Sequence, residues 1–112
     1  MAEELRKRRE DVVKYLQQMV DYTKQGKDRE AKEAYQKAYN GMVGSGATRY
    51  IENVKARTGD PKYAVPVAKA ALKSLNAYSK YINRKIKELK KEQAKLEKAE
   101  KKFEKLRAKL EK

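Results

Sequence analysis

The stretch that decides the fold occupies residues 61–112 and reads PKYAVPVAKAALKSLNAYSKYINRKIKELKKEQAKLEKAEKKFEKLRAKLEK. Beyond Pro66 it contains neither glycine nor proline, so nothing in it interrupts a helix. A seam of mostly apolar positions recurs at steps of three and four, the spacing of one helix face. Its members are Ala68, Leu72, Leu75, Ser79, Ile82, Ile86, Leu89, Gln93, Leu96, Ala99, Phe103, Leu106 and Leu110. This heptad-like pattern predicts one helix roughly 65–70 Å long, at 1.5 Å per residue.

Three shorter helical segments are expected upstream, over about 3–25, 29–42 and 47–57. Gly26 should end the first segment, and Asp28 should be the N-cap of the second. A connection this short predicts an antiparallel hairpin. The residues expected to face inward are Leu5, Val12, Val13, Leu16, Met19, Val20 and Thr23 in the first segment, Ala31, Ala34, Tyr35, Ala38, Tyr39 and Met42 in the second, and Ala47, Tyr50, Ile51 and Val54 in the third.

Glycine and proline mark the two remaining connections. Residues 40–46 read NGMVGSG, which favours a loop, the alternative being a close approach of the backbone to another helix or to phosphate. In residues 58–61, TGDP, Gly59 should end a helix, Asp60 should cap the next, and Pro61 should be its first residue. Pro66 either kinks the long helix or marks its true start after a short turn.

These segments predict an all-α protein, a bundle of three shorter helices plus one long C-terminal helix with a coiled-coil-like distal half. We expect residues 1–87 to form the bundle and residues 88–112 to extend beyond it, because the short helices cannot cover so long a partner. The extension should then be covered by a second copy, which predicts a homo-oligomer; the alternative is a solvated single helix held by Glu/Lys pairs. The expected self-association residues are Leu89, Leu96, Phe103, Leu106 and Leu110.

The chain has a strong excess of positive charge, with 30 Lys and Arg against 16 Asp and Glu, a net charge of +14 over 112 residues. Such a charge disfavours a compact state through self-repulsion unless a partner neutralises it. The candidate partners are nucleic acid, an anionic membrane surface or an acidic protein. The alternative is a solvated Lys/Glu surface, as in thermostable or designed proteins.

The excess charge is concentrated in residues 59–87, which hold seven cations and one acid, and no acid follows Asp60 up to Lys87. Cations and amides recur there by threes and fours, forming a basic stripe beside the apolar seam. Lys and Arg neutralise phosphates, and amides donate hydrogen bonds to their oxygens, so the stripe suits a phosphate backbone. The predicted nucleic-acid-binding residues of this stretch are Lys62, Lys69, Lys73, Asn76, Lys80, Asn83, Arg84, Lys87 and Lys91.

Two other basic segments differ from the stripe. The N-terminal cluster Arg6, Arg8 and Arg9 is a further candidate contact to nucleic acid, although acidic residues surround it. In the last 25 residues Lys and Glu alternate, with pairs such as Glu97 and Lys101 at the i,i+4 spacing. We interpret that tail as the solvated surface of a coiled coil.

Catalysis is not expected. The sequence contains no Cys and no His, which excludes thiolate and imidazole chemistry, and it shows no acidic cluster that predicts a metal site. Ser45 lacks the Gly-x-Ser-x-Gly elbow of a nucleophile and is expected to be a capping or loop residue. We therefore predict a protein that is not an enzyme, with no cofactor, no metal and no small-molecule substrate.

No apolar run approaches the roughly 20 residues that span a bilayer, and the first residues, MAEELRKRRE, lack a signal-peptide core. Membrane binding is disfavoured, and a soluble protein, intracellular and nucleoid-associated or within a virion, is expected. In general character the chain resembles small basic helical proteins that coat or package DNA in hyperthermophilic archaea and their viruses, and also computationally designed bundles. The function expected is sequence-independent binding of nucleic acid, with duplex DNA favoured over RNA; the alternative is a purely structural bundle.

Overall fold

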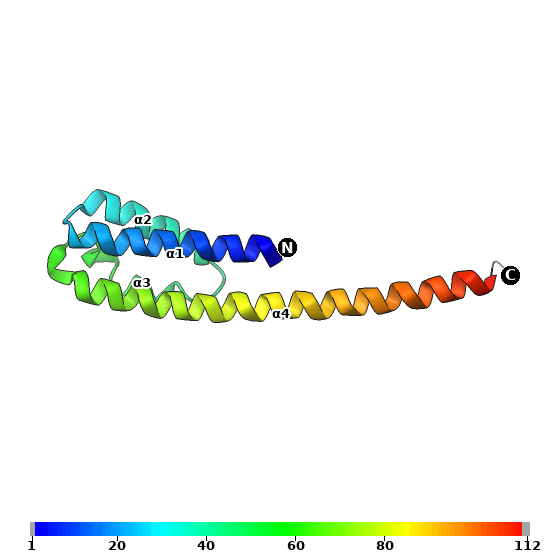
Figure 1. The fold of residues 1–112 in the computed structure, drawn as a ribbon. Coiled ribbons are helices and arrows are strands. Elements are labelled where there is room, and N and C mark those ends of the chain that lie inside the picture. Colours follow the sequence, from blue (N-terminus) through cyan, green and yellow to red (C-terminus); the bar gives the residue numbers. More distant parts are fainter. Residues whose placement is uncertain (1, 111–112) are drawn as a thin grey trace.

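The computed structural model describes residues 2–110, which form four α-helices and two short 3₁₀ turns without any strand (Figure 1). The elements are α1 (Ala2–Lys24), α2 (Asp28–Met42), α3 (Arg49–Glu52), 3₁₀ turns at Lys55–Arg57 and Pro61–Tyr63, and α4 (Ala64–Leu110). The prediction of an all-α fold with one long C-terminal helix is confirmed. Residues 111 and 112, which the long helix was expected to include, lie outside the described part.

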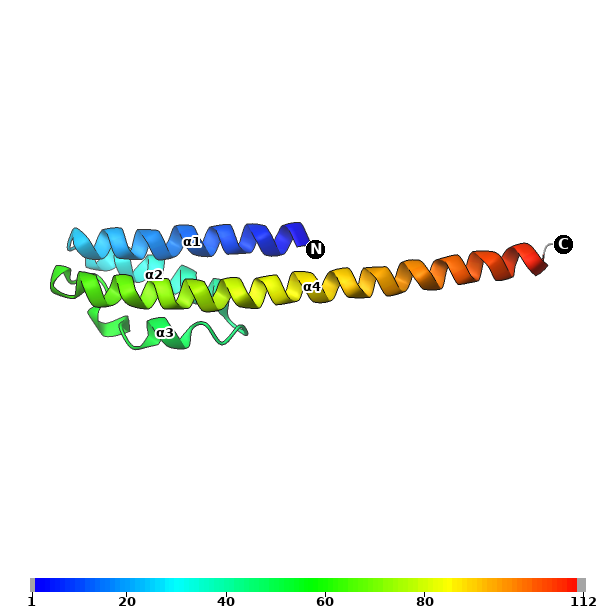
Figure 2. The ribbon, with the colours of Figure 1, turned by 60° about the horizontal axis from the view of Figure 1, so that its bottom comes forward.

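Helix α4 is the axis of the molecule, and the other elements cover only its first half. Helices α1 and α2 form an antiparallel hairpin, α1 packs along α4, and α3 packs against another face of α4, below it in Figure 2. The N-terminus of α1 lies near the middle of α4, so the second half of α4 projects alone (Figure 1). The described chain therefore measures 77 × 18 × 15 Å.

The turn between α1 and α2 ends the first helix where the sequence predicts. Gly26 has φ +71°, and the amide of Lys27 donates to the carbonyl of Tyr22 at 2.9 Å, which satisfies the end of the helix. The prediction of Asp28 as N-cap is wrong, because Lys27 takes the cap position and Asp28 is the first helical residue. There its carboxylate lies 2.9 Å from the Lys32 ammonium and suits the positive end of the helix dipole.

The glycine segment contains both of the alternatives considered for it. Gly44 and Gly46 form a loop with φ of +88° and +80°, and a Cβ on either would meet nothing within 4 Å. Gly41 instead lies inside α2, where a Cβ would stand 2.7 Å from Cγ2 of Val12. That glycine therefore permits a close approach of α2 to α1.

The third helix is much shorter than the expected span of residues 47–57. The α-helical part is only Arg49–Glu52, and a 3₁₀ turn at Lys55–Arg57 follows it. Ala47, Ile51 and Val54 are buried as predicted, whereas Tyr50 is half-buried. The α-helix gives way to a 3₁₀ turn, and the chain then brings Gly59 against the α1–α2 turn. There the amide of Gly59 donates to Thr23 Oγ1 at 3.0 Å.

The start of α4 follows the predicted signals. Oδ1 of Asp60 accepts a hydrogen bond from the amide of Lys62 at 3.0 Å, and Pro61 opens the 3₁₀ turn that leads into the helix. Pro66 is the third residue of α4, where a missing N–H leaves no hydrogen bond unmade. Pro66 therefore lies in the first turn of α4, in agreement with the alternative that it marks the start of the helix after a short turn.

The buried face of α4 only partly matches the predicted seam. Ile82 and Ile86 are buried as expected, but Leu72 is 59 % exposed. The seam assumed one neighbour on one face, whereas α4 packs against both α1 and α3, and its buried face includes Ser74, which donates a hydrogen bond to the Ala47 carbonyl just before α3. That face consists of Val67, Ala70, Ala71, Ser74, Tyr78, Ile82 and Ile86. In α1, Val13 is likewise more exposed than predicted, at 40 %.

Two tyrosines lie in the core rather than at its rim. Tyr35 and Tyr78 are 3 % and 1 % exposed, and their rings stack against Tyr39 and Tyr81 at about 6 Å between centroids. Neither buried hydroxyl has a hydrogen-bond partner. Burial, assisted by the nearby Glu52 carboxylate, raises the pKa of Tyr35 to about 12.

Candidate nucleic-acid interface

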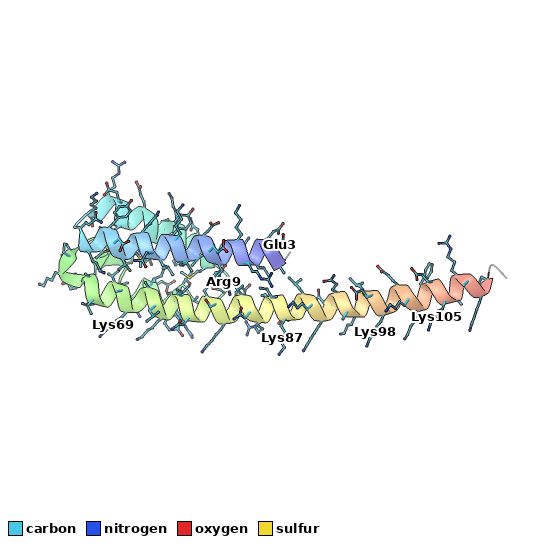
Figure 3. The ribbon with its side chains drawn as sticks, viewed as in Figure 1. Glu3, Arg9, Lys69, Lys87, Lys98 and Lys105 are labelled. Carbon is cyan, nitrogen blue, oxygen red and sulfur yellow. The ribbon has the colours of Figure 1, made fainter. Side chains whose placement is uncertain are left out.

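The predicted stripe is exposed along α4. Six cations of the stripe, which we call the stripe cations, are Lys69, Lys73, Lys80, Arg84, Lys87 and Lys91. Asn76 and Asn83 are exposed between them, and Lys62 lies on the preceding 3₁₀ turn. Lys69 and Lys87 point to the same edge of the helix (Figure 3).

Part of the stripe borders a hollow of about 700 Å³ between α4 and the α3 segment. Helix α4 contributes Lys73, Lys80 and Arg84 to its lining, and α3 contributes Arg49. The remaining lining residues are uncharged: Ser45, Gly46, Tyr50, Asn76, Ala77 and Tyr81. Four cations therefore face one hollow whose lining contains no carboxylate, an arrangement that favours a polyanion.

The hollow continues along α4 toward the start of the helix. A second space of about 200 Å³ shares Tyr50 and Lys73 with the first and reaches Lys69. We call the two together the basic groove. Its floor is α4, and its far wall is the segment that contains α3.

Two arginines of the groove lie against tyrosine rings. The guanidinium of Arg49 is 4.9 Å from the ring centroid of Tyr50, and its Nη2 donates to the Tyr50 hydroxyl at 2.8 Å. The guanidinium of Arg84 is 5.8 Å from the ring centroid of Tyr81. Cation–π contact restrains each guanidinium while leaving N–H groups that can donate to phosphate oxygens.

Hydrogen bonds of two serines hold the glycine loop, those of Ser45 within the loop and that of Ser74 from α4. Ser45 donates from Oγ to the Met42 carbonyl, and Oγ accepts from the amide of Ala47 at 3.1 Å. Oγ of the buried Ser74 donates to the carbonyl of Ala47 at 3.0 Å. These contacts place Ser45 in a capping role, as its sequence context suggested, and they position Arg49 beside α4.

The N-terminal cluster lies apart from the basic groove. Nη1 of Arg9 donates to Oδ1 of Asn83 at 3.2 Å, which places both residues on the α1 side of α4. Arg8 lines a different hollow of about 310 Å³, whose lining also holds Lys85 and three carboxylates, those of Glu4, Glu88 and Glu92. Arg6 is exposed on α1 and lines neither hollow. The N-terminal cluster, a separate candidate contact in the sequence, thus lies apart from the basic groove, and Asn83 of the stripe does not line the groove either.

The predicted self-association residues lie on the projecting half of α4. Leu89 is half-buried where the bundle ends, whereas Leu96, Phe103, Leu106 and Leu110 are 65 %, 67 %, 55 % and 79 % exposed. Within the described chain nothing covers these four side chains. An exposed apolar row of this kind is typical of an interaction surface.

Sequence reasoning missed Arg49, Tyr50 and Tyr81 as residues of the groove. Neither Arg49 nor Tyr81 was assigned a role from the sequence, and Tyr50 was expected only to face the core. The signal for Arg49 was its position three residues after Gly46, just beyond residues 40–46, the segment considered for a close approach to phosphate.

Neither a protein-family model, nor a curated protein, nor a solved structure matches the chain. The function is therefore inferred from the geometry of the site. Within residues 2–110, no helix is long and apolar enough to cross a membrane. The same residues contain no group of three or more carboxylates that could hold a metal ion.

Proposed function

We propose that this protein binds nucleic acid without sequence preference, with duplex DNA favoured over RNA, in an architectural or packaging role of the nucleoid-associated or coat-protein type. The observation that carries the proposal is the basic groove, in which Arg49, Lys73, Lys80 and Arg84 meet without a carboxylate in the lining. No catalytic step is part of this role.

The chemistry of the groove supports contacts to the sugar-phosphate backbone rather than to bases. Lys73 and Lys80 supply mobile ammonium groups, and the guanidinium of Arg84 can donate two hydrogen bonds to one phosphate. The amide of Asn76 is a further donor. Because phosphates carry no base identity, such contacts position a duplex without selecting its sequence.

Self-assembly through the projecting half of α4 is the second part of the proposal. The exposed row of Leu96, Phe103, Leu106 and Leu110 is the support for it, since burial of each large apolar side chain stabilises an interface by about 1.5–3 kcal/mol. A protein that both binds phosphates and joins to further copies has the two properties that packaging requires.

A purely structural bundle without a nucleic-acid role is the alternative. The observation that favours it is the exposure of the cations, since solvated lysines also keep a long helix soluble. The two functions differ in one measurable respect, the affinity of the groove for a phosphate backbone.

The test compares two variants that each lose three positive charges. In the groove variant, Lys73→Gln, Lys80→Gln and Arg84→Gln are combined; in the control, Lys14→Gln, Lys24→Gln and Lys37→Gln change exposed residues of α1 and α2 outside the groove and the N-terminal cluster. Binding to a labelled 30-base-pair duplex is measured by fluorescence anisotropy from about 50 to 200 mM salt. We expect the groove variant to lose at least about tenfold in affinity and up to about 2.7 in salt slope, at 0.9 for each phosphate contact.

The control should lose much less affinity, because it lowers the net charge equally without touching the groove. Equal losses of affinity in the two variants would mean that binding depends on net charge and not on the groove. A wild-type chain that fails to bind at micromolar concentration would favour the structural bundle.

A further inference from the structure

The cations of α4 gather on one side of the helix over its whole length, including the half beyond the bundle. At 100° per residue, eleven of the fifteen Lys and Arg residues in Ala64–Leu110 fall within roughly 80° of arc, where an even distribution would place about three. Six of them are the stripe cations, and the other five are Lys95, Lys98, Lys102, Lys105 and Lys109. Figure 3 shows Lys69, Lys87, Lys98 and Lys105 along the same edge of α4.

The glutamates of α4 lie outside this arc. Glu97, Glu100 and Glu104 are centred on the opposite side of the helix. Glu88 is the nearest to the arc, and its carboxylate lies 3.6 Å from the ammonium of Lys85, which is outside the arc. The alternation of Lys and Glu along the tail sequence therefore becomes a separation of charge around the helix.

The resulting row is long and straight. Lys69 and Lys109 are forty residues apart, which is about 60 Å at 1.5 Å per residue. Between them α4 is continuous, and each of the five distal lysines is exposed. The basic groove accounts for only the first third of this length, since Lys69 and Arg84 are about 22 Å apart.

A straight basic row suits a stiff polyanion better than a flexible one. A DNA duplex has a persistence length of about 500 Å, so it stays straight beside the whole row. Single strands are instead bound mainly by aromatic side chains on which bases stack. Beyond Tyr81 the one aromatic residue in the described part of α4 is Phe103, which lies well away from the arc of cations.

We propose that the entire row from Lys69 to Lys109 forms one track for the phosphate backbone of duplex DNA, with α4 lying lengthwise along the duplex. This inference rests on the proposed function of the groove and extends it to the projecting half of the helix. At 3.4 Å per base pair, a track of about 60 Å covers about 18 base pairs, against about 6 for the groove alone.

The first test uses two pairs of substitutions in the projecting half. Lys98→Gln with Lys105→Gln removes two charges from the track, and Lys90→Gln with Arg107→Gln removes two charges outside the arc. Both pairs keep good helix formers and leave the apolar row unchanged. We expect the track pair to lower affinity for a 30-base-pair duplex about tenfold and the salt slope by up to about 1.8, and the control pair to lower affinity less than about twofold.

The second test measures site size with duplexes of 6 to 30 base pairs. Affinity of the unaltered protein should rise until about 18 base pairs and then level off. A plateau near 6 base pairs, or equal losses for the two pairs of substitutions, would overturn the track. A 30-nucleotide single strand that binds as tightly as the duplex would overturn the assignment of a stiff partner.

The groove variant distinguishes the failure of this inference from failure of the proposed function. If the groove variant loses affinity while the track pair does not, the groove binds nucleic acid and only the track is wrong. If the groove variant binds like the unaltered protein, the proposed function itself is wrong. Circular dichroism of each variant checks that α4 remains helical.

Discussion

The two halves of α4 are one continuous helix in very different surroundings. In residues 64–87 the helix packs against α1 and α3, and Val67, Ser74 and Ile82 are fully buried. In residues 90–110 every side chain is exposed, including Leu96 and Phe103. The helix itself is unbroken across the boundary.

The comparison shows that helix formation and helix burial have different causes in this protein. Continuity comes from the local sequence, because residues 67–110 contain no glycine or proline and are rich in Ala, Leu, Lys and Glu, which are strong helix formers. Burial of α4 depends instead on where the other helices end. Small residues such as Ala70 and Ala71 let neighbours approach the first half closely, whereas the second half has no neighbour among residues 2–110 (Figure 2).

The largest expected effect contrasts one apolar residue from each half. Ile82→Ala removes a fully buried side chain and should lower the free energy of unfolding by about 3 kcal/mol, through lost apolar burial and the cavity left behind. Leu96→Ala removes a side chain that is 65 % exposed, and should lower it by less than about 0.5 kcal/mol in dilute solution. Urea unfolding followed by tyrosine fluorescence measures both. Similar losses would mean that the distal half is covered even at low concentration.

Alkaline pH should affect the bundle through Tyr35, and the distal half contains no tyrosine. The pKa of Tyr35 is raised from 10.0 to about 12 in the folded state, mainly by burial. Between these values the unfolded chain loses this proton and the folded chain keeps it, so stability is complete below pH 10 and falls as the pH rises toward 12. The loss from this group should be on the order of 2 kcal/mol.

Tyr35→Phe is the control for this effect, because burial also raises the pKa of Tyr78, which would add to an alkaline loss. The variant should be at least as stable at pH 7, since the buried hydroxyl has no hydrogen-bond partner, and it should lose less stability between pH 10 and 12. An alkaline loss that is the same in both proteins would remove Tyr35 as its cause.

The smallest expected effect concerns association of the distal halves. Leu96→Ser combined with Phe103→Ser should weaken self-association at least tenfold, about 1.4 kcal/mol, because both side chains would be buried by a second copy. Sedimentation equilibrium over a range of protein concentrations measures it. Leu72→Ser is the matched control, since Leu72 is also exposed on α4 but lies beside the bundle. An unaltered protein that is monomeric at all concentrations would rule out this interface.

Much of the fold was predictable because it depends on local signals. Gly26, Gly59, Asp60 and Pro61 act within a few residues of themselves, and the connections that they mark lie where expected. The predictions that are wrong depend on tertiary contacts. Leu72 is exposed because the neighbours of α4 cover other faces of the helix, and the chain after the short third helix hydrogen-bonds back to Thr23 through the amide of Gly59.

The residues that α4 contributes to the candidate site were predictable from the sequence, and those that other elements contribute were not. The stripe cations follow from helical spacing, which fixes their common face. Arg49 comes from another element, and its position opposite Lys80 depends on hydrogen bonds of Ser45 and Ser74 that no spacing rule contains. The pairing of Arg9 with Asn83 depends in the same way on how α1 packs against α4.

The length by which α4 projects has a consequence for helical phase. Residues 88–110 add about 34 Å of helix, which equals about one turn of B-form DNA. A duplex lying along α4 would therefore present the same strand and groove to Leu110 as it presents to Glu88. After Pro66 the sequence has no glycine or proline at which α4 could bend, so the distance between Glu88 and Leu110 stays constant. Each bound copy of the protein would therefore match one helical repeat of the DNA.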